Sequence, residues 1–253
     1  MGRTLAIVNQ KGGAGKTTTA VNLAACLAAA ERKTLLVDFD PQGNATSGFG
    51  QEDPGPKGGA YAMLTQGASP ESVIEKTALE HLYLIRSGID LIAAEMELAQ
   101  LPGREFRLRE TLSPYLPLYQ YILIDCPPSL GLLTLNALVA ADSLIIPLQC
   151  EYYALEGLSK LMRTISLVQA RFNPGLNTEG ILLTMFDTRT ALSHQVAADI
   201  RAHFNGHIFD TVVPRNVRLS EAPSHGKPII LYDISSTGAT AYLRLAGEVI
   251  ANG

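Results

Sequence analysis

Short apolar runs, rich in β-branched residues, alternate with longer segments of helical periodicity along most of the chain. Runs at 122–124 and 144–146 are continuously apolar, which is typical of strands buried on both faces of a parallel sheet. The pattern predicts strands at 5–9, 34–38, 82–85, 121–125, 143–147, 180–186 and 207–213. It predicts helices at 16–30, 132–141, 154–172, 191–204 and 238–251. Such alternation indicates an α/β fold with one doubly wound, mostly parallel sheet and helices on both faces.

One stretch, 41–57, breaks this alternation because it is dense in Gly, Asn, Asp and Pro. Short helical pieces follow it up to about residue 114. The chain shows no internal repeat, and no linker divides it into parts. We therefore interpret residues 1–253 as a single domain.

The composition is that of a folded protein, with 47% hydrophobic and 17% charged residues. Disordered chains, by contrast, are poor in apolar residues and rich in charge. No window approaches 18 uninterrupted apolar residues, so we expect no segment to span a membrane. Cys26, Cys126 and Cys150 lie far apart, which excludes a disulfide framework or a metal cluster by spacing. These features predict a cytoplasmic globular protein.

The first predicted strand runs into a glycine-rich turn, residues 10–18, that leads directly into a helix. A turn of this kind binds anions, because backbone N–H groups point into it and the helix dipole favours negative charge there. Lys16 is expected to reach the β- and γ-phosphates of a nucleotide, and the Thr17 hydroxyl to bind Mg²⁺. The strict motif G-x-x-x-x-G-K-[ST] is not matched, because Gln10 stands at its first glycine. The residues predicted to hold the phosphates are Lys11, Gly12, Gly13, Ala14, Gly15, Lys16, Thr17 and Thr18.

A second lysine, Lys11, precedes this turn. Lys16 already serves the phosphates of its own loop, so Lys11 has two possible roles. One is to contact phosphates held by a second subunit, which would link nucleotide binding to dimerisation. The other is that of a solvated loop lysine, and spacing alone does not decide between them.

Acidic residues end two of the buried strands, at Asp38, Asp40 and Asp125. Ligands of open parallel sheets bind at the carboxyl ends of the strands, so these acids are expected to converge on the phosphate loop. An acid that ends a buried strand is costly unless a cation or hydrogen-bond donors meet it. We assign Asp125 to Mg²⁺, Asp38 to support of the metal shell and Asp40 to orientation of the attacking water. For Asp38 a purely structural role at the strand end stays open.

The residues described so far resemble the ParA/Soj chromosome-partitioning ATPases. Residues 11–18 are similar to the deviant Walker A loop, 38–46 to the switch I segment and 122–129 to the Walker B strand. Residues 149–157 and 213–229 resemble further stretches of that family, and the likeness covers essentially the whole chain. The loop alone would also fit MinD, nitrogenase iron protein and Mrp-type proteins.

The resemblance implies a P-loop ATPase that binds ATP and Mg²⁺ and forms a homodimer with ATP sandwiched at the interface. Lys11 then matches the signature lysine that reaches the partner's phosphates, which makes it a catalytic residue with Lys16 and Asp40. Pro214 and Asn216 match positions near the adenine. The family also implies non-specific binding to double-stranded DNA, a ParB-like centromere-binding partner that stimulates hydrolysis, and a place on the nucleoid.

DNA binding must be weighed against a formal net charge of −4. Residues 1–125 hold 11 Lys and Arg against 14 Asp and Glu, and residues 126–253 hold 9 against 10, so neither half is basic. Affinity for the phosphate backbone then requires clustered cations, or cations paired across a dimer. Arg189 is one candidate contact, and Arg218 matches a position implicated in DNA contact by the family resemblance. Scattered, solvated cations are the alternative.

Three other functions compete with DNA partitioning. A MinD-like ATPase that positions cargo on a membrane or at a polar protein cluster needs a basic amphipathic C-terminal helix, whereas residues 242–253 hold one Arg and one Glu. We therefore expect no stable membrane association. An electron donor needs cysteines that converge on an iron–sulfur cluster, and the spacing of Cys26, Cys126 and Cys150 does not indicate one. A nucleotide-gated scaffold would bind ATP without hydrolysing it, and Asp40 argues for hydrolysis.

Overall fold

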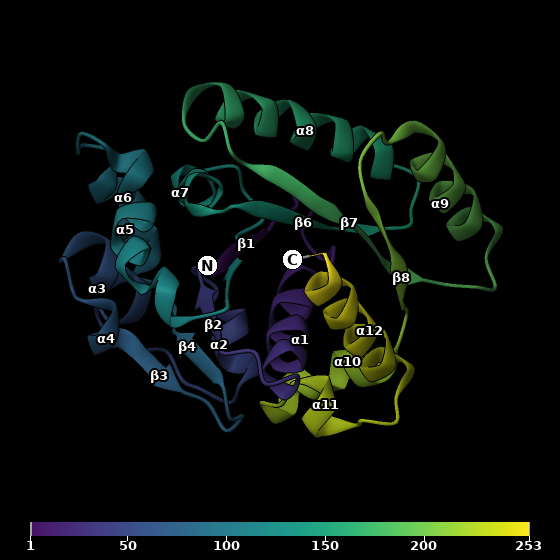
Figure 1. The fold of residues 1–253 in the computed structure, drawn as a ribbon, viewed down its shortest axis with the longest axis horizontal. Helices are drawn as coiled ribbons and strands as arrows, with labels where there is room; N and C mark the ends of the chain where they lie inside the picture. Colours follow the sequence, from purple (N-terminus) through teal and green to yellow (C-terminus); the bar gives the residue numbers. More distant parts are fainter. Residues whose placement is uncertain (1, 253) are drawn as a thin grey trace.

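One eight-stranded sheet forms the centre of the computed structural model, which describes residues 2–252 (Figure 1). The strands are β1 (Arg3–Ile7), β2 (Thr34–Asp38), β3 (Ile74–Lys76), β4 (Leu82–Ile85), β5 (Tyr121–Asp125), β6 (Ser143–Gln149), β7 (Asn177–Phe186) and β8 (Ile208–Pro214). Their order across the sheet is β3-β4-β2-β5-β1-β6-β7-β8, and every neighbouring pair is parallel except β3 with β4. The predicted fold class is confirmed.

Helices cover both faces of this sheet, with α7, α8 and α9 on one side and α1, α10, α11 and α12 on the other (Figure 1). The helices are α1 (Lys16–Ala29), α2 (Asn44–Gly48), α3 (Gly59–Thr65), α4 (Pro70–Val73), α5 (Leu91–Leu98), α6 (Arg107–Leu112), α7 (Leu132–Ala140), α8 (Ala154–Arg171), α9 (Ala191–His203), α10 (Val217–Glu221), α11 (Ile229–Tyr232) and α12 (Thr237–Ala251). Three 3₁₀ helices are η1 (Arg104–Phe106), η2 (Ser113–Leu118) and η3 (Ala222–His225).

The central strands divide their side chains between two hydrophobic cores. Leu35 and Val37 of β2 lie in the core on one face, and Leu36 between them lies in the core on the other. Ile124 and Leu123 of β5 are divided in the same way. Because successive side chains of a strand point to opposite faces, a strand buried on both sides must be apolar throughout. This explains the uninterrupted apolar runs in the sequence.

The structure differs from the predicted elements mainly at the margins. Strand β3 was not predicted, because it has three residues, two of them charged, at the edge of the sheet. The helix α2 lies inside the stretch 41–57 that the pattern marked as irregular, and a single turn is too short to show a period. Strand β7 begins three residues earlier than predicted, because the polar residues Asn177 and Thr178 pair with β6.

No helix among residues 2–252 is long and apolar enough to cross a membrane. Cys26, Cys126 and Cys150 are all buried and free. The described residues contain no group of three His, Cys, Asp or Glu side chains placed to hold a metal ion.

Candidate functional site

The phosphate loop lies between the end of β1 and the start of α1 and borders a cavity of about 500 Å³. Neighbouring strands β5 and β2 bring Asp125 and Asp38 to the same edge of the sheet, in register with each other. The cavity is lined by Gly12, Gly13, Gly15, Lys16, Thr17, Thr18, Val21, Asn22, Asp40, Gln42, Asn44, Ser47, Gly48, Pro128, Met185, Ala222, Pro223 and Lys227. The structure therefore brings together most of the predicted phosphate residues with Asp40.

The backbone of the loop requires glycine at two positions. Gly13 and Gly15 have φ of 74° and 90°, in the left-handed region that residues with a Cβ rarely adopt. The carbonyl of Ala14 accepts a hydrogen bond of 2.9 Å from the Thr184 hydroxyl at the end of β7. The sequence did not identify Thr184, because it lies 170 residues from Ala14 and carries no motif of its own.

Lys16 is almost buried, with 6% of its surface exposed, and its ammonium donates to the Lys11 carbonyl over 3.1 Å. Burial lowers the pKa of Lys16, and the negative charges of Asp125 and Asp40 oppose that shift. The side chain thus curls back over its own loop. This is the position from which an ammonium can contact the terminal phosphates of a bound nucleotide.

Asp125 is fully buried, and neither carboxylate oxygen makes a hydrogen bond within the part of the chain that the structure describes. Burial, followed by the charge of Asp38, raises its pKa well above the ordinary value, while Thr17 and Lys16 act in the opposite direction. A buried carboxylate without a partner is costly. The Asp125 oxygens therefore form an unsatisfied anionic site next to the Thr17 hydroxyl, which fits a Mg²⁺ shell.

Asp38 is equally buried, but both of its oxygens have partners. One accepts from the backbone and hydroxyl of Thr46, each over 2.7 Å, and the other accepts from the Asp40 backbone over 3.2 Å. The Thr46 hydroxyl in turn accepts from the Ser87 backbone over 3.0 Å. Burial raises the pKa of Asp38 to about 6, against the effect of these hydrogen bonds. These contacts support the structural alternative for Asp38, which holds residues 40–46 in place.

Asp40 faces the cavity and is 6% exposed. One oxygen accepts from the Gln42 backbone over 3.0 Å, and the structure gives the other oxygen no hydrogen bond among residues 2–252. A carboxylate that is held at one oxygen and open at the other is suited to orienting a water molecule. The role predicted for Asp40 is compatible with this geometry and stays a prediction.

Lys11 does not line the cavity, although it belongs to the same loop. Its backbone N–H donates to the Asn9 side chain over 2.9 Å, and its ammonium forms an ion pair with Glu151, which follows β6. The lysine side chain is 45% exposed. Lys11 is therefore neither free in solvent nor directed at the phosphates of its own loop, and the sequence did not identify Glu151 as its partner.

A second cavity, of about 370 Å³, adjoins the first and shares Gly15, Thr18, Met185 and Pro223 with it. Pro214 and Asn216, the predicted adenine positions, line it. Asn216 also caps α10 by accepting from the Leu219 backbone, and it donates to the Thr237 hydroxyl over 2.7 Å. The two cavities adjoin, which is compatible with a phosphate end and an adenine end, and the adenine positions stay a prediction. Met185 lies between them with a φ of 50°, and no motif marked it.

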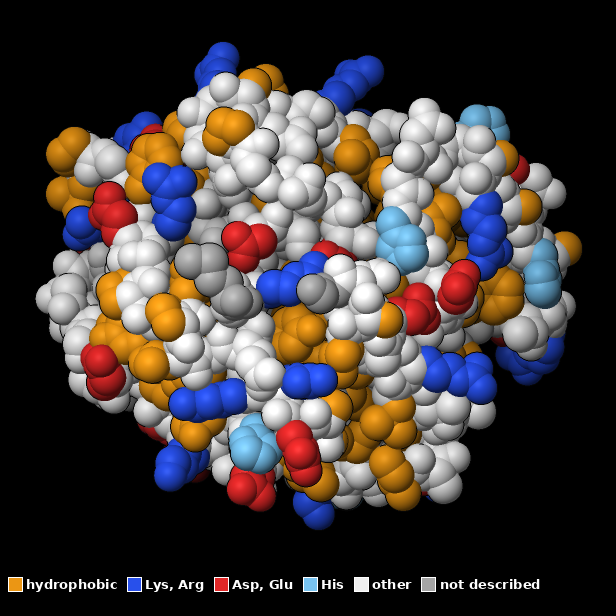
Figure 2. All heavy atoms as spheres, viewed as in Figure 1, with side chains coloured by type: hydrophobic (Ala, Val, Ile, Leu, Met, Phe, Trp, Pro, Cys, Tyr) orange, Lys and Arg blue, Asp and Glu red, His pale blue; other side chains and the backbone are white. Residues whose placement is uncertain are grey.

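The two predicted DNA contacts are both engaged by carboxylates. Arg189 pairs with Asp187 over 2.8 Å, and Arg218 pairs with Glu221 over 2.9 Å and with Asp233 over 3.4 Å. On the face shown in Figure 2, Lys and Arg side chains are dispersed among acidic and apolar ones. The structure therefore does not gather the cations into a single patch on that face.

A family model described as an AAA domain matches residues 2–178. The chain is 57% identical over 250 residues to the chromosome partitioning protein ParA of Myxococcus xanthus, which covers 99% of this chain and 88% of that protein. It is 56% identical over 253 residues to the sporulation initiation inhibitor protein Soj of Bacillus subtilis, with all of both chains covered. The chain belongs to the ParA/Soj family.

A solved structure agrees with this assignment at the level of the fold. The cobyrinic acid a,c-diamide synthase of Mycobacterium smegmatis, solved with bound ADP and magnesium, superposes with a TM-score of 0.87 at 36% identity. The match covers 100% of this chain and 95% of that one. The fold is that of the P-loop NTPases, in which the loop between the first strand and first helix holds phosphates.

Proposed function

We propose that this protein is a Mg²⁺-dependent ATPase that partitions chromosomes or plasmids. The observation that carries the proposal is the buried, unpartnered carboxylate of Asp125 beside Thr17 and the nearly buried Lys16. A Mg²⁺ ion bound by Thr17 and, through water, by Asp125 would neutralise charge on the β- and γ-phosphates of ATP. Membership of the ParA/Soj family supports the role in partitioning.

In the proposed reaction the chain mainly positions and neutralises groups. Backbone N–H groups of the loop hold the phosphates, and the Lys16 ammonium contacts their terminal oxygens. Asp40 orients the attacking water with its open oxygen, while Asp38 keeps residues 40–46 in place through Thr46. Pro214 and Asn216 line the base end of the site.

We further propose that ATP drives the formation of a homodimer with the nucleotide at its interface. Lys11 supports this, because it does not line its own cavity and because, within residues 2–252, its ammonium is held only by the partly exposed Glu151. On release from Glu151 the ammonium is free to contact phosphates of the partner subunit. The dimer then binds double-stranded DNA without sequence preference and associates with the nucleoid, and a ParB-like partner stimulates hydrolysis.

The net charge of −4 supports a role for dimerisation in DNA binding. On the face shown in Figure 2 the cations of one subunit are dispersed, and a dimer doubles the number of cations that one DNA molecule can meet. One face of the helix α12 packs Tyr242, Leu245 and Val249 into the hydrophobic core that also holds Leu36 and Leu123. That face is therefore not available for a membrane.

Gel filtration and a DNA-shift assay with ATP test this proposal on the wild type and three variants. Lys16→Ala should lose every response to nucleotide, because it removes the phosphate-binding ammonium. Lys11→Ala should bind ATP but stay monomeric, whereas Asp40→Ala should dimerise and shift DNA persistently because hydrolysis is slowed. An Asp40→Ala protein that stays monomeric with ATP and never shifts DNA would contradict the switch.

A further inference from the structure

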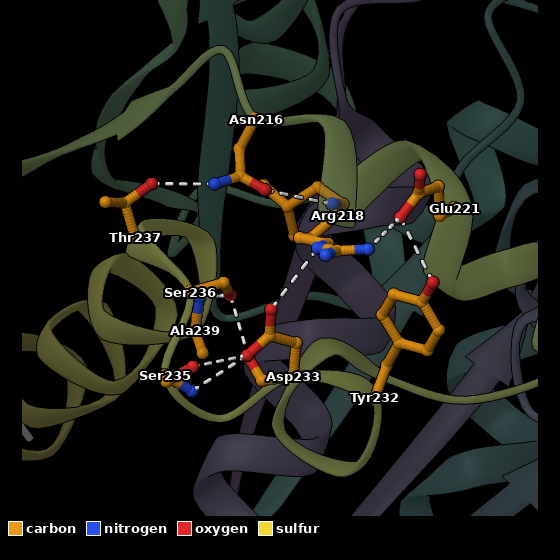
Figure 3. Close-up of polar contacts among 10 residues, drawn as sticks. Asn216, Arg218, Glu221, Tyr232, Asp233, Ser235, Ser236, Thr237 and Ala239 are labelled. Carbon is orange, nitrogen blue, oxygen red and sulfur yellow. Dashed lines mark hydrogen bonds and ion pairs between the residues drawn. The ribbon is translucent and has the colours of Figure 1, made fainter.

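Arg218 lies in a polar cluster on the segment that joins β8 to α12 (Figure 3). Its guanidinium donates to Glu221, one helical turn further along α10, over 2.9 Å. On the opposite side it meets Asp233, which follows α11, over 3.4 Å. The arginine therefore bridges two carboxylates from different elements.

Each carboxylate has a second anchor that fixes its position. The Tyr232 hydroxyl donates to Glu221 over 3.1 Å, and the Tyr232 ring stacks on His225 at 4.9 Å. Asp233 accepts from both the backbone and the hydroxyl of Ser235, over 3.1 and 2.7 Å (Figure 3). Both acids are thus held by the fold, and Arg218 lies between them.

This arrangement distinguishes Arg218 from other cations in the second half of the chain. Six have no carboxylate within ion-pair distance among the residues that the structure describes: Arg163, Arg171, Arg201, Arg215, Lys227 and Arg244. Arg218 has two. With one positive and two negative charges, the cluster presents a net charge of −1 to an approaching polyanion. The arginine itself is 54% exposed, so it is accessible but electrostatically compensated.

We infer that Glu221 and Asp233 compete with DNA phosphates for Arg218 and thereby limit the affinity of this surface for DNA. The inference rests on the proposed DNA binding. A phosphate that contacts Arg218 must displace at least one of the two carboxylates, and the other still repels it. Glu221 is the stronger competitor, because its contact with the guanidinium is the shorter one.

The same segment also forms part of the nucleotide cavity. Pro223 and Lys227 line the cavity, and the backbone of Ile229, at the start of α11, donates to Asn22 of α1 over 2.6 Å. Asn22 lines the cavity as well and donates to the Thr18 carbonyl over 2.8 Å. The acids that hold Arg218 therefore lie on the same segment as residues that line the cavity.

The test compares DNA affinity of the wild type, Glu221→Gln and a matched control, Asp210→Asn, all with ATP. Fluorescence anisotropy with a random-sequence duplex is followed at KCl from about 0.1 to about 0.3 M. Asp210 is exposed and its side chain makes no hydrogen bond in the described structure, so Asp210→Asn removes one charge without touching Arg218. Each phosphate contact adds about 0.9 to the slope of log affinity against log salt.

Glu221→Gln should bind more tightly and steepen that slope by about 1.8 for the two arginines of a dimer. Between about 0.1 and about 0.3 M KCl, a slope steeper by about 1.8 means that Glu221→Gln loses about sevenfold more affinity than the wild type does. Asp210→Asn should have the same DNA affinity and the same salt slope as the wild type. In an Arg218→Ala background, Glu221→Gln should give a much smaller gain than it gives with Arg218 present. With Arg218 present, Asp233→Asn should give a smaller gain than Glu221→Gln does.

Three results would overturn the inference while wild-type DNA binding stands: no gain in Glu221→Gln, an equal gain in Asp210→Asn, or a gain of the same size in Glu221→Gln without Arg218. A wild type that binds no duplex with ATP would instead overturn the proposed function and the inference with it. Circular dichroism shows which variants fold. If Glu221→Gln does not fold, the inference is tested with Asp233→Asn, whose DNA affinity is compared with that of the wild type and of Asp210→Asn in the same way.

Discussion

Replacing Asp125 with asparagine should make the nucleotide-free protein more stable and at the same time abolish its response to Mg-ATP. The carboxylate is fully buried and has no hydrogen-bond partner in the described structure. In the absence of Mg²⁺ it must either stay ionised without solvation or take up a proton. Asparagine has nearly the same shape and carries no charge, so both costs are replaced by the smaller cost of burying an unpaired amide.

The gain has an upper limit set by the cost of protonation. The ordinary pKa is 3.8, so protonating the acid at about pH 7.5 costs about 5 kcal/mol. Burying the ionised carboxylate of Asp125 cannot cost more than this, because the carboxylate would take up a proton instead. We expect a gain of about 1–5 kcal/mol in the free energy of unfolding. A protein of this size responds by about 2–4 °C in Tm for each kcal/mol.

The gain should also depend on pH. Burial raises the pKa of Asp125 in the folded protein above its unfolded value. The stability that comes with its protonation is fully present below pH 3.8 and is lost as pH rises through the folded pKa. The free energy of unfolding of Asp125→Asn should therefore exceed that of the wild type most at high pH, and the difference should shrink as the pH falls toward about 5.

Urea and thermal unfolding in EDTA, at several pH values between about 5 and about 8, measure this difference. Asp210→Asn is the matched control and should stay within about 0.5 kcal/mol of the wild type, because its side chain is exposed. Saturation with Mg-ATP at about 100 times Kd should stabilise the wild type by about 2.7 kcal/mol and Asp125→Asn by much less. An Asp125→Asn protein that is less stable than the wild type in EDTA would refute the reasoning, since the stabilising effects of Thr17 and Lys16 on the carboxylate would then outweigh the cost of its burial.

Substitutions at two further residues test the buried hydrogen bonds around the site. Thr46→Val removes the hydroxyl that donates to Asp38 and accepts from Ser87, so its free energy of unfolding in urea should fall by about 2–4 kcal/mol. Thr46→Ser keeps the hydroxyl and should lose about 1 kcal/mol. Equal losses in the two variants would contradict a role for the hydroxyl. Asn22→Ala leaves the buried Ile229 N–H without its acceptor and should cost about 1–3 kcal/mol, with an increase in hydrogen exchange at Ile229; unchanged exchange there would argue against this link between α1 and α11.

The sequence by itself determined the fold class and the phosphate loop. Strands such as β5 are apolar at every position because both of their faces are buried, so a run of consecutive apolar residues predicts a parallel sheet. The loop was predictable because its requirements are local. Gly13 and Gly15 need positive φ, and Lys16 and Thr17 follow them at the start of the helix.

The tertiary structure alone decided which partners these residues meet. The contacts of Ala14 with Thr184 and of Asn22 with Ile229 join positions 170 and 207 residues apart. Periodicity shows which face of an element a residue occupies, but it does not show which strand lies beside which. Here the order β5-β1-β6-β7 brings the end of β7 close to the phosphate loop.

The same limit applies to the charged residues. From the sequence, Lys11 and Arg218 are cations at motif positions, and their spacing says nothing of a neutralising partner. The fold places Glu151 against Lys11, and Glu221 and Asp233 against Arg218. Since the strength of an electrostatic contact depends on distance and burial, only the arrangement of the chain in space decides whether these charges are free or held.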